Sequence, residues 1–372
     1  MIIQSKLPRP GLIVVDEEHD PSYKQQDGAR YSARDLAVWR AHDLRIPIVL
    51  GSATPSLESW QQAEIGRYVR LNLTGRVGGS LLPRVRLFDM KALPPQPGVS
   101  TALTAPLIAA LQERLARGEQ SLVFLNRRGY APVLHCGECQ WKSDCPHCSA
   151  WRVFHKIDRT LRCHHCGLTE RVPRACPACG NLDIGTQGRG TEQLEERIAE
   201  LLAGVQRPSG EPVRIARIDA DSTRGQGKLE SALAQVHAGD VDVLVGTQMI
   251  AKGHDFRRVT LVAAINPDAA LFSSDFRAPE RLFALLMQSA GRAGRDAAAG
   301  ADSQMWVQTQ HPQHPLFVAL KSHDYPGFAA RQLAERQQAG FPPFTHLALL
   351  RAEARSQDAA QAFLTALAAQ AA

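Results

Sequence analysis

Cysteine is absent from most of this 372-residue chain, because all eight cysteines fall between Cys136 and Cys179. A secreted protein held together by disulfides would distribute its cysteines more widely and would normally carry a signal peptide. The N-terminus lacks the basic, apolar and small-residue order of such a peptide, and no apolar run approaches the length of a membrane span. These absences argue against a disulfide-stabilised secreted protein, so we expect a cytoplasmic protein without a membrane partner.

The composition also lacks any extreme of charge or aromatic content. Lysine and arginine total 43 against 37 acidic residues, which gives a net charge of +6, and only 6% of the residues are aromatic. Hydrophobic residues make up 44%, which is enough for buried cores, and the length suits two or three domains. The small positive excess favours a polyanionic partner such as nucleic acid.

The eight cysteines form four C-x-x-C pairs. Four such pairs can build two tetrathiolate sites, for which zinc is the natural metal. A redox function would not require four pairs, and an iron–sulfur cluster fits less well because regular knuckles at this spacing resemble zinc ribbons. Histidines in the same segment could act as ligands, but eight thiols already suffice for two sites; these are His135, His147, His164 and His165. The spacing alone leaves open which pairs share an ion.

Short apolar runs alternate with helical patterns along the rest of the chain, which predicts an α/β fold of parallel sheets covered by helices. Strands are expected at residues 12–15, 46–50, 121–125, 213–218, 241–245, 259–265 and 305–309. Helices are expected at residues 31–42, 106–117, 192–202, 228–236 and 279–291, with an alanine-rich helix at the end of the chain. The continuous apolar run at 12–15 is typical of a strand buried on both faces. Trp39 fits the core face of its helix, and glycine and proline at 74–99 predict a linker.

A cluster of charge, Asp16-Glu17-Glu18-His19, follows the first strand directly. Open α/β sheets bind their ligands at the carboxyl ends of strands. Carboxylates this close together repel one another unless a cation or hydrogen-bond donors hold them. A magnesium ion that carries a nucleotide phosphate would supply that charge. The alternative is a solvated acidic turn, which would be the better interpretation if the cluster stood alone.

Further motifs lie where predicted strands and helices end or begin. They are G-S-A-T-P at 51–55, G-T-Q-M-I-A-K-G-H-D-F at 246–256, Q-S-A-G-R-A-G-R at 288–295 and G-R-G-T-E at 188–192. Each has an ordinary structural explanation by itself. In this order, together with the acids, they resemble the motor motifs of superfamily-2 helicases. The stretch D-E-E-H-D-P-S-Y-K-Q, the cysteine segment and D-F-R-A-P-E-R at 275–281 resemble, more narrowly, the PriA family of primosomal replication-restart helicases.

The resemblance implies RecA-like parallel-sheet motor domains, an inserted two-zinc ribbon-like module and a small partial C-terminal α+β domain. The implied domains are a partial first motor domain at 1–78, a linker and the start of the second motor domain at 79–120, the second motor domain at 121–133 and 183–312, the zinc insert at 134–182 and the truncated C-terminal domain at 313–372.

The implied activity is that of an ATP-dependent DNA helicase that moves 3′ to 5′, recognises stalled replication forks and reloads the replication machinery. The implied cofactors are two zinc ions and ATP with Mg²⁺. The implied partners are forked and single-stranded DNA, primosome and replication-restart proteins, and single-stranded DNA-binding protein.

The resemblance also assigns roles within the nucleotide site. Asp16 lies at the magnesium ion and Glu17 activates the attacking water. Gln288 senses the nucleotide, while Arg292 and Arg295 stabilise charge on the γ-phosphate. Further residues expected to contact nucleotide or magnesium are His19, Gly253 and Asp255.

DNA contacts are implied at two places. Tyr23, Lys24 and Tyr31 match an aromatic-rich loop that links DNA binding to hydrolysis, since tyrosine can stack on bases and lysine can pair with phosphate. Residues that couple the nucleotide site to the DNA backbone are Thr54, Thr247 and Lys252. The alternatives are two half-buried tyrosines and an ordinary surface lysine.

The family arranges its zinc ligands in a nested pattern, in which the outer knuckles close around the inner ones. The outer site would contain Cys136, Cys139, Cys176 and Cys179. The inner site would contain Cys145, Cys148, Cys163 and Cys166, with a hairpin between its two pairs.

One motor motif is missing from the sequence. A helicase motor needs a phosphate loop of the form G-x-x-x-x-G-K-[ST], and the only Gly-Lys pair here, Gly227-Lys228, precedes a leucine. We therefore expect a C-terminal part of a longer protein that is inactive in isolation. The alternative is a non-catalytic zinc-bearing module that binds DNA or primosome proteins through a degenerate motor fold.

Overall fold

The structure is a computed structural model that describes most of the chain. The residues outside the description are 1–9, 26–27, 74, 76–81, 93–102, 126–132, 137, 140, 148–150, 156–158, 164–166, 187–189, 220–221, 224–226, 248–255, 257, 272, 274, 295–301, 349, 351, 353, 355 and 372.

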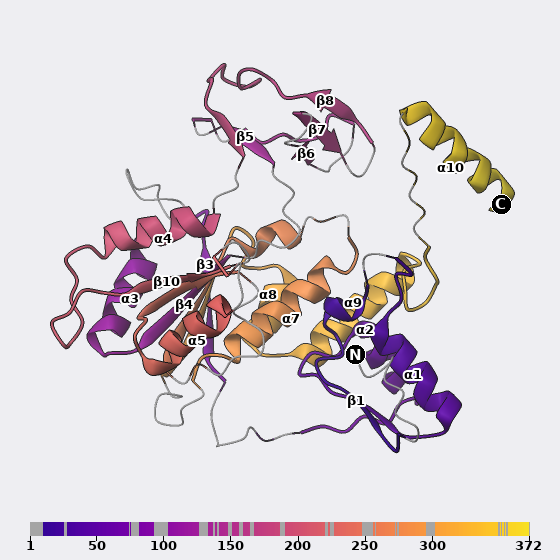
Figure 1. Cartoon of the computed structure of the whole chain (residues 1–372), viewed down its shortest axis with the longest axis horizontal. Helices are drawn as coiled ribbons and strands as arrows, with labels where there is room; N and C mark the ends of the chain where they lie inside the picture. Colours follow the sequence, from indigo (N-terminus) through magenta and orange to yellow (C-terminus); the bar gives the residue numbers. More distant parts are fainter. Residues whose placement is uncertain are drawn as a thin grey trace. The chain divides into compact units, whose positions relative to one another are not determined.

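A six-stranded sheet forms the centre of the fold (Figure 1), and all of its paired strands run parallel. The spatial order is β10-β11-β4-β12-β13-β3. The strands are β3 (Arg84–Asp89), β4 (Gln120–Leu125), β10 (Ile215–Ile218), β11 (Val243–Gly246), β12 (Val259–Ile265) and β13 (Gln304–Thr309). The central strands β4, β11 and β12 are buried along nearly their whole length because helices cover both faces. The predicted α/β class is confirmed.

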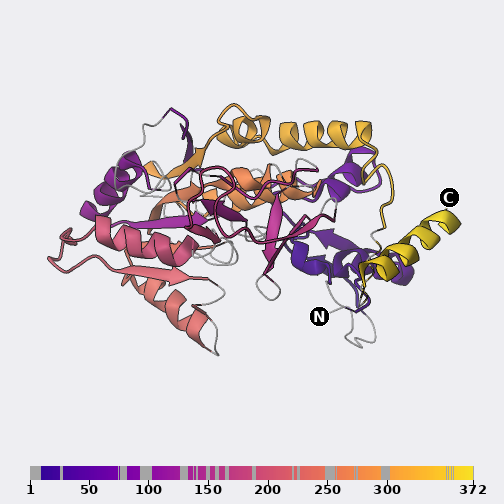
Figure 2. The ribbon, with the colours of Figure 1, turned by 90° about the horizontal axis from the view of Figure 1, so that it is seen from above.

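Helices pack on both faces of this sheet, as Figure 2 shows from above. They are α3 (Ala105–Ala116), α4 (Gly190–Leu201), α5 (Lys228–Ala238), α7 (Ala278–Ala290) and α8 (Pro315–Lys321). Helices α3 and α4 bury Leu107, Leu111 and Ile198 against Val123 and Val245 of the sheet. Residues of opposite parity on the same strands, such as Leu122 and Leu244, are buried on the other face.

Strand β3 lies inside the stretch that was expected to be a linker. It pairs with β13 from Arg84↔Gln304 to Asp89↔Thr309 and forms one edge of the sheet. Its sequence, R-V-R-L-F-D, begins with the alternation typical of a half-buried strand, and Val85 is buried while Arg84 and Arg86 are exposed. The glycines and prolines on either side concealed this signal.

A smaller parallel pair joins β1 (Ile13–Val15) to β2 (Ile48–Leu50), with α1 (Ala33–Leu44) between them in sequence. The expectation of two buried faces is wrong here, because Val14 is 54% exposed while Val15 is buried. Among the described residues, Ala37 and Ala41 of α1 cover one face of the pair. The expected core position of Trp39 is also wrong, since this side chain is 64% exposed.

The cysteine insert is built from short antiparallel strands. Its two ends pair through β5 (Leu134–Cys136) and β9 (Ile184–Thr186). Between them lies a three-stranded sheet of β6 (Arg152–His155), β7 (Thr160–Cys163) and β8 (Thr169–Arg171). Strands β6 and β7 form the expected hairpin between the second and third cysteine pairs.

The chain divides into two compact units, which differ from the domains expected. The first contains Met1–Pro55 and Arg70–Phe328; the second contains Ser56–Val69 and Ala329–Ala372. Helices of the second unit are α2 (Leu57–Glu64), most of α9 (Tyr325–Gln338) and α10 (Gln357–Ala371). Among the described residues no helix is both long and apolar enough to cross a membrane. The described residues also form two 3₁₀ turns, Pro21–Tyr23 and Pro267–Ala270.

Candidate functional site

The acidic cluster forms a tight turn at the carboxyl end of β1. The Glu17 backbone amide donates to Asp16 Oδ1 at 2.9 Å, and Glu17 has a positive φ of 48°. The turn is fixed to the end of β2, because the Glu18 amide donates to the Gly51 carbonyl at 3.0 Å and the Gly51 amide donates to the Val15 carbonyl at 2.8 Å. The acids and the G-S-A-T stretch therefore lie at one sheet edge, as the motif order implied.

Gln288 of α7 reaches this turn and contacts two of its members. Its Nε2 donates to Glu17 Oε2 at 3.1 Å and lies 3.1 Å from Nε2 of His19. On the other side of the imidazole, His19 Nδ1 lies 2.7 Å from Ser52 Oγ and 3.5 Å from Glu17 Oε2. A neutral imidazole that carries its proton on Nδ1 satisfies both nitrogens. Four residues from three separate motifs thus share one hydrogen-bond network.

Glu18 points away from this network into the protein. It is only 2% exposed, and Arg34 Nη1 of α1 lies 3.2 Å from Glu18 Oε2. A buried carboxylate needs such a partner. The pairing explains two adjacent glutamates with different functions, because Glu18 anchors the turn while the side chain of Glu17 stays 45% exposed.

The residues that follow the acids fold back on the turn. Tyr23 donates its hydroxyl to the Asp16 carbonyl at 2.7 Å. Burial raises the pKa of Tyr23, and the nearby acids Asp16 and Asp20 raise it further. Lys24 donates its ammonium to the Arg30 carbonyl, and the Gln25 amide donates to the Tyr31 carbonyl. The loop is therefore attached directly to the acidic turn.

Other predicted site residues lie elsewhere in the described chain. Arg292, just beyond α7, is 7% exposed, and Thr247 is half-buried after the end of β11. Thr54 is buried, and its hydroxyl has no hydrogen-bond partner among the residues that the structure describes. Predicted residues outside the described part are Lys252, Gly253, Asp255 and Arg295.

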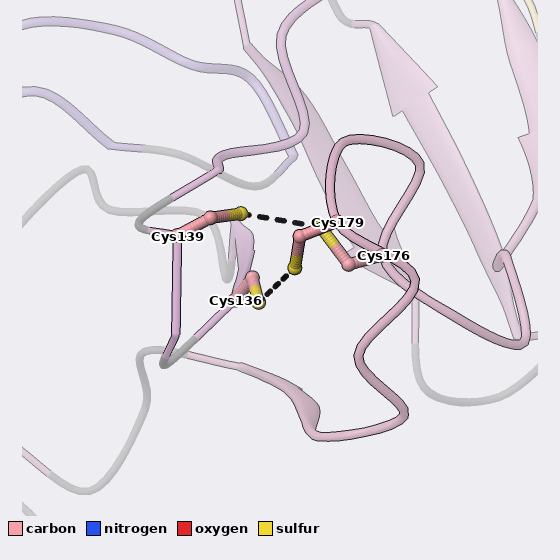
Figure 3. Close-up of side chains that lie close together, drawn as sticks. All are labelled: Cys136, Cys139, Cys176 and Cys179. Carbon is pink, nitrogen blue, oxygen red and sulfur yellow. Dashed lines mark hydrogen bonds between the residues drawn. The ribbon is translucent and has the colours of Figure 1, made fainter.

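Four cysteines from the two ends of the insert meet at one point (Figure 3). The sulfur of Cys136 lies 3.6 Å from that of Cys179, and the sulfur of Cys139 lies 3.5 Å from that of Cys176. All four sulfurs lie within 4.8 Å of one another. A tetrahedral zinc with bonds of about 2.3 Å separates its ligands by about 3.8 Å, so the cluster has the size of a tetrathiolate site.

The local backbone prepares one of these thiols for metal binding. Burial alone would raise the pKa of Cys176, but hydrogen bonds from the backbone amides of Cys179 and Ala178, and contacts with the thiols of Cys139 and Cys179, lower it to about 7. The same sulfur contacts raise the pKa of Cys179 and of Cys139. Since metals bind the thiolate form, Cys176 offers a ligand near neutral pH.

The second set of cysteines is described in part. Cys145 and Cys163 are buried, and Cys163 pairs with Arg152 across the β6–β7 hairpin. Cys148 and Cys166 lie outside the described residues. The outer cluster matches half of the nested arrangement, and the inner site stays a prediction.

Sequence reasoning missed two residues that contact the acidic turn. Ser52 stood within a recognised motif, but no pattern indicated that it would contact His19. Arg34 had no sequence signal at all, because an arginine in a predicted helix is ordinary. A buried acid such as Glu18 always requires a partner, but the sequence does not identify it.

Comparison with known proteins identifies two regions of the chain. The sequence model described as the PriA DNA helicase Cys-rich region domain matches residues 145–171. The model described as the helicase conserved C-terminal domain matches residues 189–297. These regions cover the inner cysteine pairs and the strands β10, β11 and β12 of the six-stranded sheet, with the G-T-Q-M and Q-S-A-G-R motifs.

Whole-chain similarity agrees with these matches. The replication restart protein PriA of Haemophilus influenzae is 46% identical over 96% of this chain and 47% of that protein. The Bacillus subtilis protein of the same name is 40% identical over 96% of this chain and 42% of that protein. The chain spans about half the length of the curated relatives it matches. Among solved structures, RecG bound to a three-way DNA junction has a TM-score of 0.43 with 14% identity, covering 87% of this chain and 30% of that chain. That similarity is too weak to support an argument. The resemblance expected from the motifs is confirmed.

Proposed function

We propose, from the kinship of this chain with the PriA replication restart proteins, that it is part of an ATP-dependent DNA helicase. The complete protein would move 3′ to 5′ on DNA, recognise stalled replication forks and reload the replication machinery with other primosome proteins and single-stranded DNA-binding protein. Within it, this chain would supply the acids of the hydrolysis site, the helix that senses the nucleotide, and the zinc-bearing insert.

The observation that carries this proposal is the network of Gln288 with Glu17 and His19. In a helicase motor, a change in the bound nucleotide must alter contacts between separate structural elements. Gln288 contacts the carboxylate proposed to position water and the histidine beside it, so a change in the bound nucleotide would alter both contacts. A degenerate fold with no catalytic function has no physical need for this arrangement.

The residues present fit a magnesium ion with a nucleotide. Asp16 is exposed and uses Oδ1 to accept the Glu17 amide, so its second oxygen can serve as a ligand. Magnesium commonly takes one or two carboxylates together with substrate phosphates and water. The ion would neutralise phosphate charge, while Glu17 orients the attacking water and Arg292 and Arg295 stabilise the γ-phosphate.

The cysteine-rich region fits zinc. The thiolates of Cys136, Cys139, Cys176 and Cys179 would hold one ion in a closed site, which is typical of structural zinc. A second ion would bind the inner knuckles, where the PriA Cys-rich region matches.

The test is the Glu17→Gln variant of the full-length protein. ATP turnover should fall to near background while nucleotide and DNA binding remain, because the carboxylate that orients water is lost. Glu230→Gln, an exposed glutamate in the first turn of α5, is the matched control and should be fully active. Near-normal turnover in Glu17→Gln would exclude the proposed role and favour a non-catalytic module. Duplexes with a 3′ or a 5′ single-stranded tail test the proposed direction in the same preparation.

A further inference from the structure

The cysteine insert contains a cavity that the proposed function does not use. Its volume is about 870 Å³, and it lies at the end of the three-stranded sheet where β7 begins and β8 ends. The lining residues are Arg159, Thr160, Arg171, Val172, Pro173, Arg174, Leu182 and Ile184. All of them belong to the insert, so this cavity is separate from the acidic turn.

Three arginines in one cavity create a concentrated positive charge. The pairing of Thr160 with Arg171, and the bond from the Val172 amide to the Arg159 carbonyl, bring Arg159 and Arg171 to the same end of adjacent strands. Arg174 follows three residues later. In the part of the chain that the structure describes, none of the three arginines has an acidic partner, and no acidic residue lines the cavity. Like charges held close together favour an anion that neutralises them.

Other arginines of the same insert do have partners. Arg152 pairs with Glu170 and donates its Nε to the Asp144 carbonyl at 2.9 Å. Arg162 donates to Thr160 Oγ1 at 3.1 Å. The insert therefore satisfies the arginines that support its fold and leaves the cavity arginines exposed to solvent.

The rest of the lining is apolar. Leu182 is 78% exposed, and Val172, Pro173 and Ile184 are half-buried beside it. An inorganic anion would leave this surface unused, whereas a ligand with charged and apolar parts would use both. The volume lies within the range typical of sites for small ligands and is too small for a duplex.

We infer that this cavity binds the backbone of single-stranded nucleic acid, with phosphates on the three guanidiniums and sugars or bases against the apolar residues. Guanidinium matches phosphate through paired, charge-assisted hydrogen bonds. This inference rests on the proposed function, since a DNA motor is what would bring a single strand to the insert. It places a DNA contact within the zinc-bearing part, apart from the contacts at the acidic turn.

The experiment measures binding of the whole 372-residue chain, loaded with zinc, to a fluorescent oligothymidylate over a range of salt concentrations. The variant Arg159→Ala/Arg171→Ala/Arg174→Ala should bind roughly tenfold or more weakly at low salt. The slope of log K against log salt should fall by about 2, because each lost phosphate contact on a single strand contributes about 0.7. The corresponding triple lysine variant keeps the charge and should keep most of the slope.

Lys142→Ala is the matched control. Lys142 lies over the ring of Trp151 at 5.2 Å, and Trp151 precedes β6 at the opposite end of this sheet. The Lys142→Ala substitution removes a positive charge from the insert and leaves the cavity unchanged. The slope of log K against log salt should therefore change by less than about 0.7. Zinc content equal to that of the unmodified chain shows that each variant is folded.

An unchanged salt slope in the zinc-loaded triple alanine variant would overturn the inference. A glutamate-rich peptide provides a second arm. If that peptide bound through the same arginines while oligonucleotide binding stayed unaffected, the cavity would be a protein-docking site and the inference would be wrong. These measurements need no ATP turnover, so their outcome is independent of the Glu17→Gln result.

Discussion

The six-stranded sheet and the cysteine insert belong to one chain but are stabilised in different ways. The sheet buries long side chains from both faces, such as Leu107, Leu122 and Phe283. Few large apolar side chains of the insert are buried in the described chain, chiefly Leu134 and Leu161, and its strands have three or four residues. Burial of apolar area can stabilise the sheet, whereas the insert has too little of it. We therefore expect the insert to depend on metal bonds for its fold.

Zinc removal should produce the largest difference between the two regions. Structural zinc contributes about 10–16 kcal/mol in zinc-finger peptides at pH 7, so a strong chelator should unfold residues 134–186. The sheet has no cysteine in its strands and should stay folded. Hydrogen exchange resolved by peptide segment measures the protection of the insert and of the sheet, and metal analysis of the untreated chain measures its zinc content. We expect two zinc ions per chain and loss of amide protection in the insert alone. Continued protection of the insert after complete metal release would show that the comparison is mistaken.

Double cysteine variants should show which cysteines bind the same zinc ion. Cys136→Ser/Cys179→Ser removes two ligands from one cluster, so one of the two zinc ions should be lost. Cys136→Ser/Cys145→Ser has the same number of changes but affects both proposed sites, so both ions should be lost. Zinc stoichiometry by mass spectrometry under native conditions distinguishes them. The nested arrangement is wrong if the first pair loses both ions and the second pair loses one.

A cavity in the core of the sheet should destabilise the sheet without affecting the zinc content of the insert. Leu122 of β4 is 1% exposed, so Leu122→Ala should lower the free energy of unfolding by about 2–5 kcal/mol and leave zinc content unchanged. Val14→Ala in β1 is the control, because this side chain is largely exposed and its loss should cost less than about 0.5 kcal/mol. Denaturant unfolding, monitored by hydrogen exchange, measures the loss of unfolding free energy in both variants. Similar losses in the two variants would mean that Val14 has a covering layer.

Glu170→Gln should give the smallest effect. It removes the ion pair with Arg152, but Glu170 is 48% exposed and Arg152 keeps its bond to the Asp144 carbonyl. A solvent-screened pair of this kind contributes about 1 kcal/mol or less, and metal bonds should hold the insert in place. Zinc affinity measured by competition with a chelator should stay within a few-fold of the original. A loss of zinc in this variant would show that the ion pair stabilises the insert about as much as the metal bonds do.

The central strands could be predicted from the sequence because both of their faces are apolar. Strands β4, β11 and β12 combine short apolar runs with helical patterns on either side, so their period and length agree with burial in a parallel sheet. Edge strand β3 escaped prediction since its alternating pattern is brief and lies among glycines and prolines. Local composition outweighed a real but short periodic signal.

The surroundings of an element were harder to predict than the element itself. The apolar run at β1 looks the same whether one layer or two cover it, so the exposure of Val14 could not be foreseen. Helix α1 lacks a marked apolar face, which is why Trp39 was assigned to the wrong side.

The candidate site shows the same limit. The motifs identified Glu17, His19 and Gln288 separately, but the direct contacts of Gln288 depend on packing across 271 residues of sequence for Glu17 and 269 for His19. The buried pair of Glu18 with Arg34 follows only from the fold. Residue types and their order gave the chemistry, and tertiary structure supplied the connections.

The pairing of β5 with β9 brings the entry and exit of the insert side by side, with Leu134 opposite Thr186. A segment whose ends meet in this way does not alter the path of the chain that surrounds it. Evolution can then lengthen, shorten or exchange the segment without redesigning its host. A protein engineer could do the same, by replacing everything between the two strands with a tight hairpin turn that joins Cys136 to Ile184.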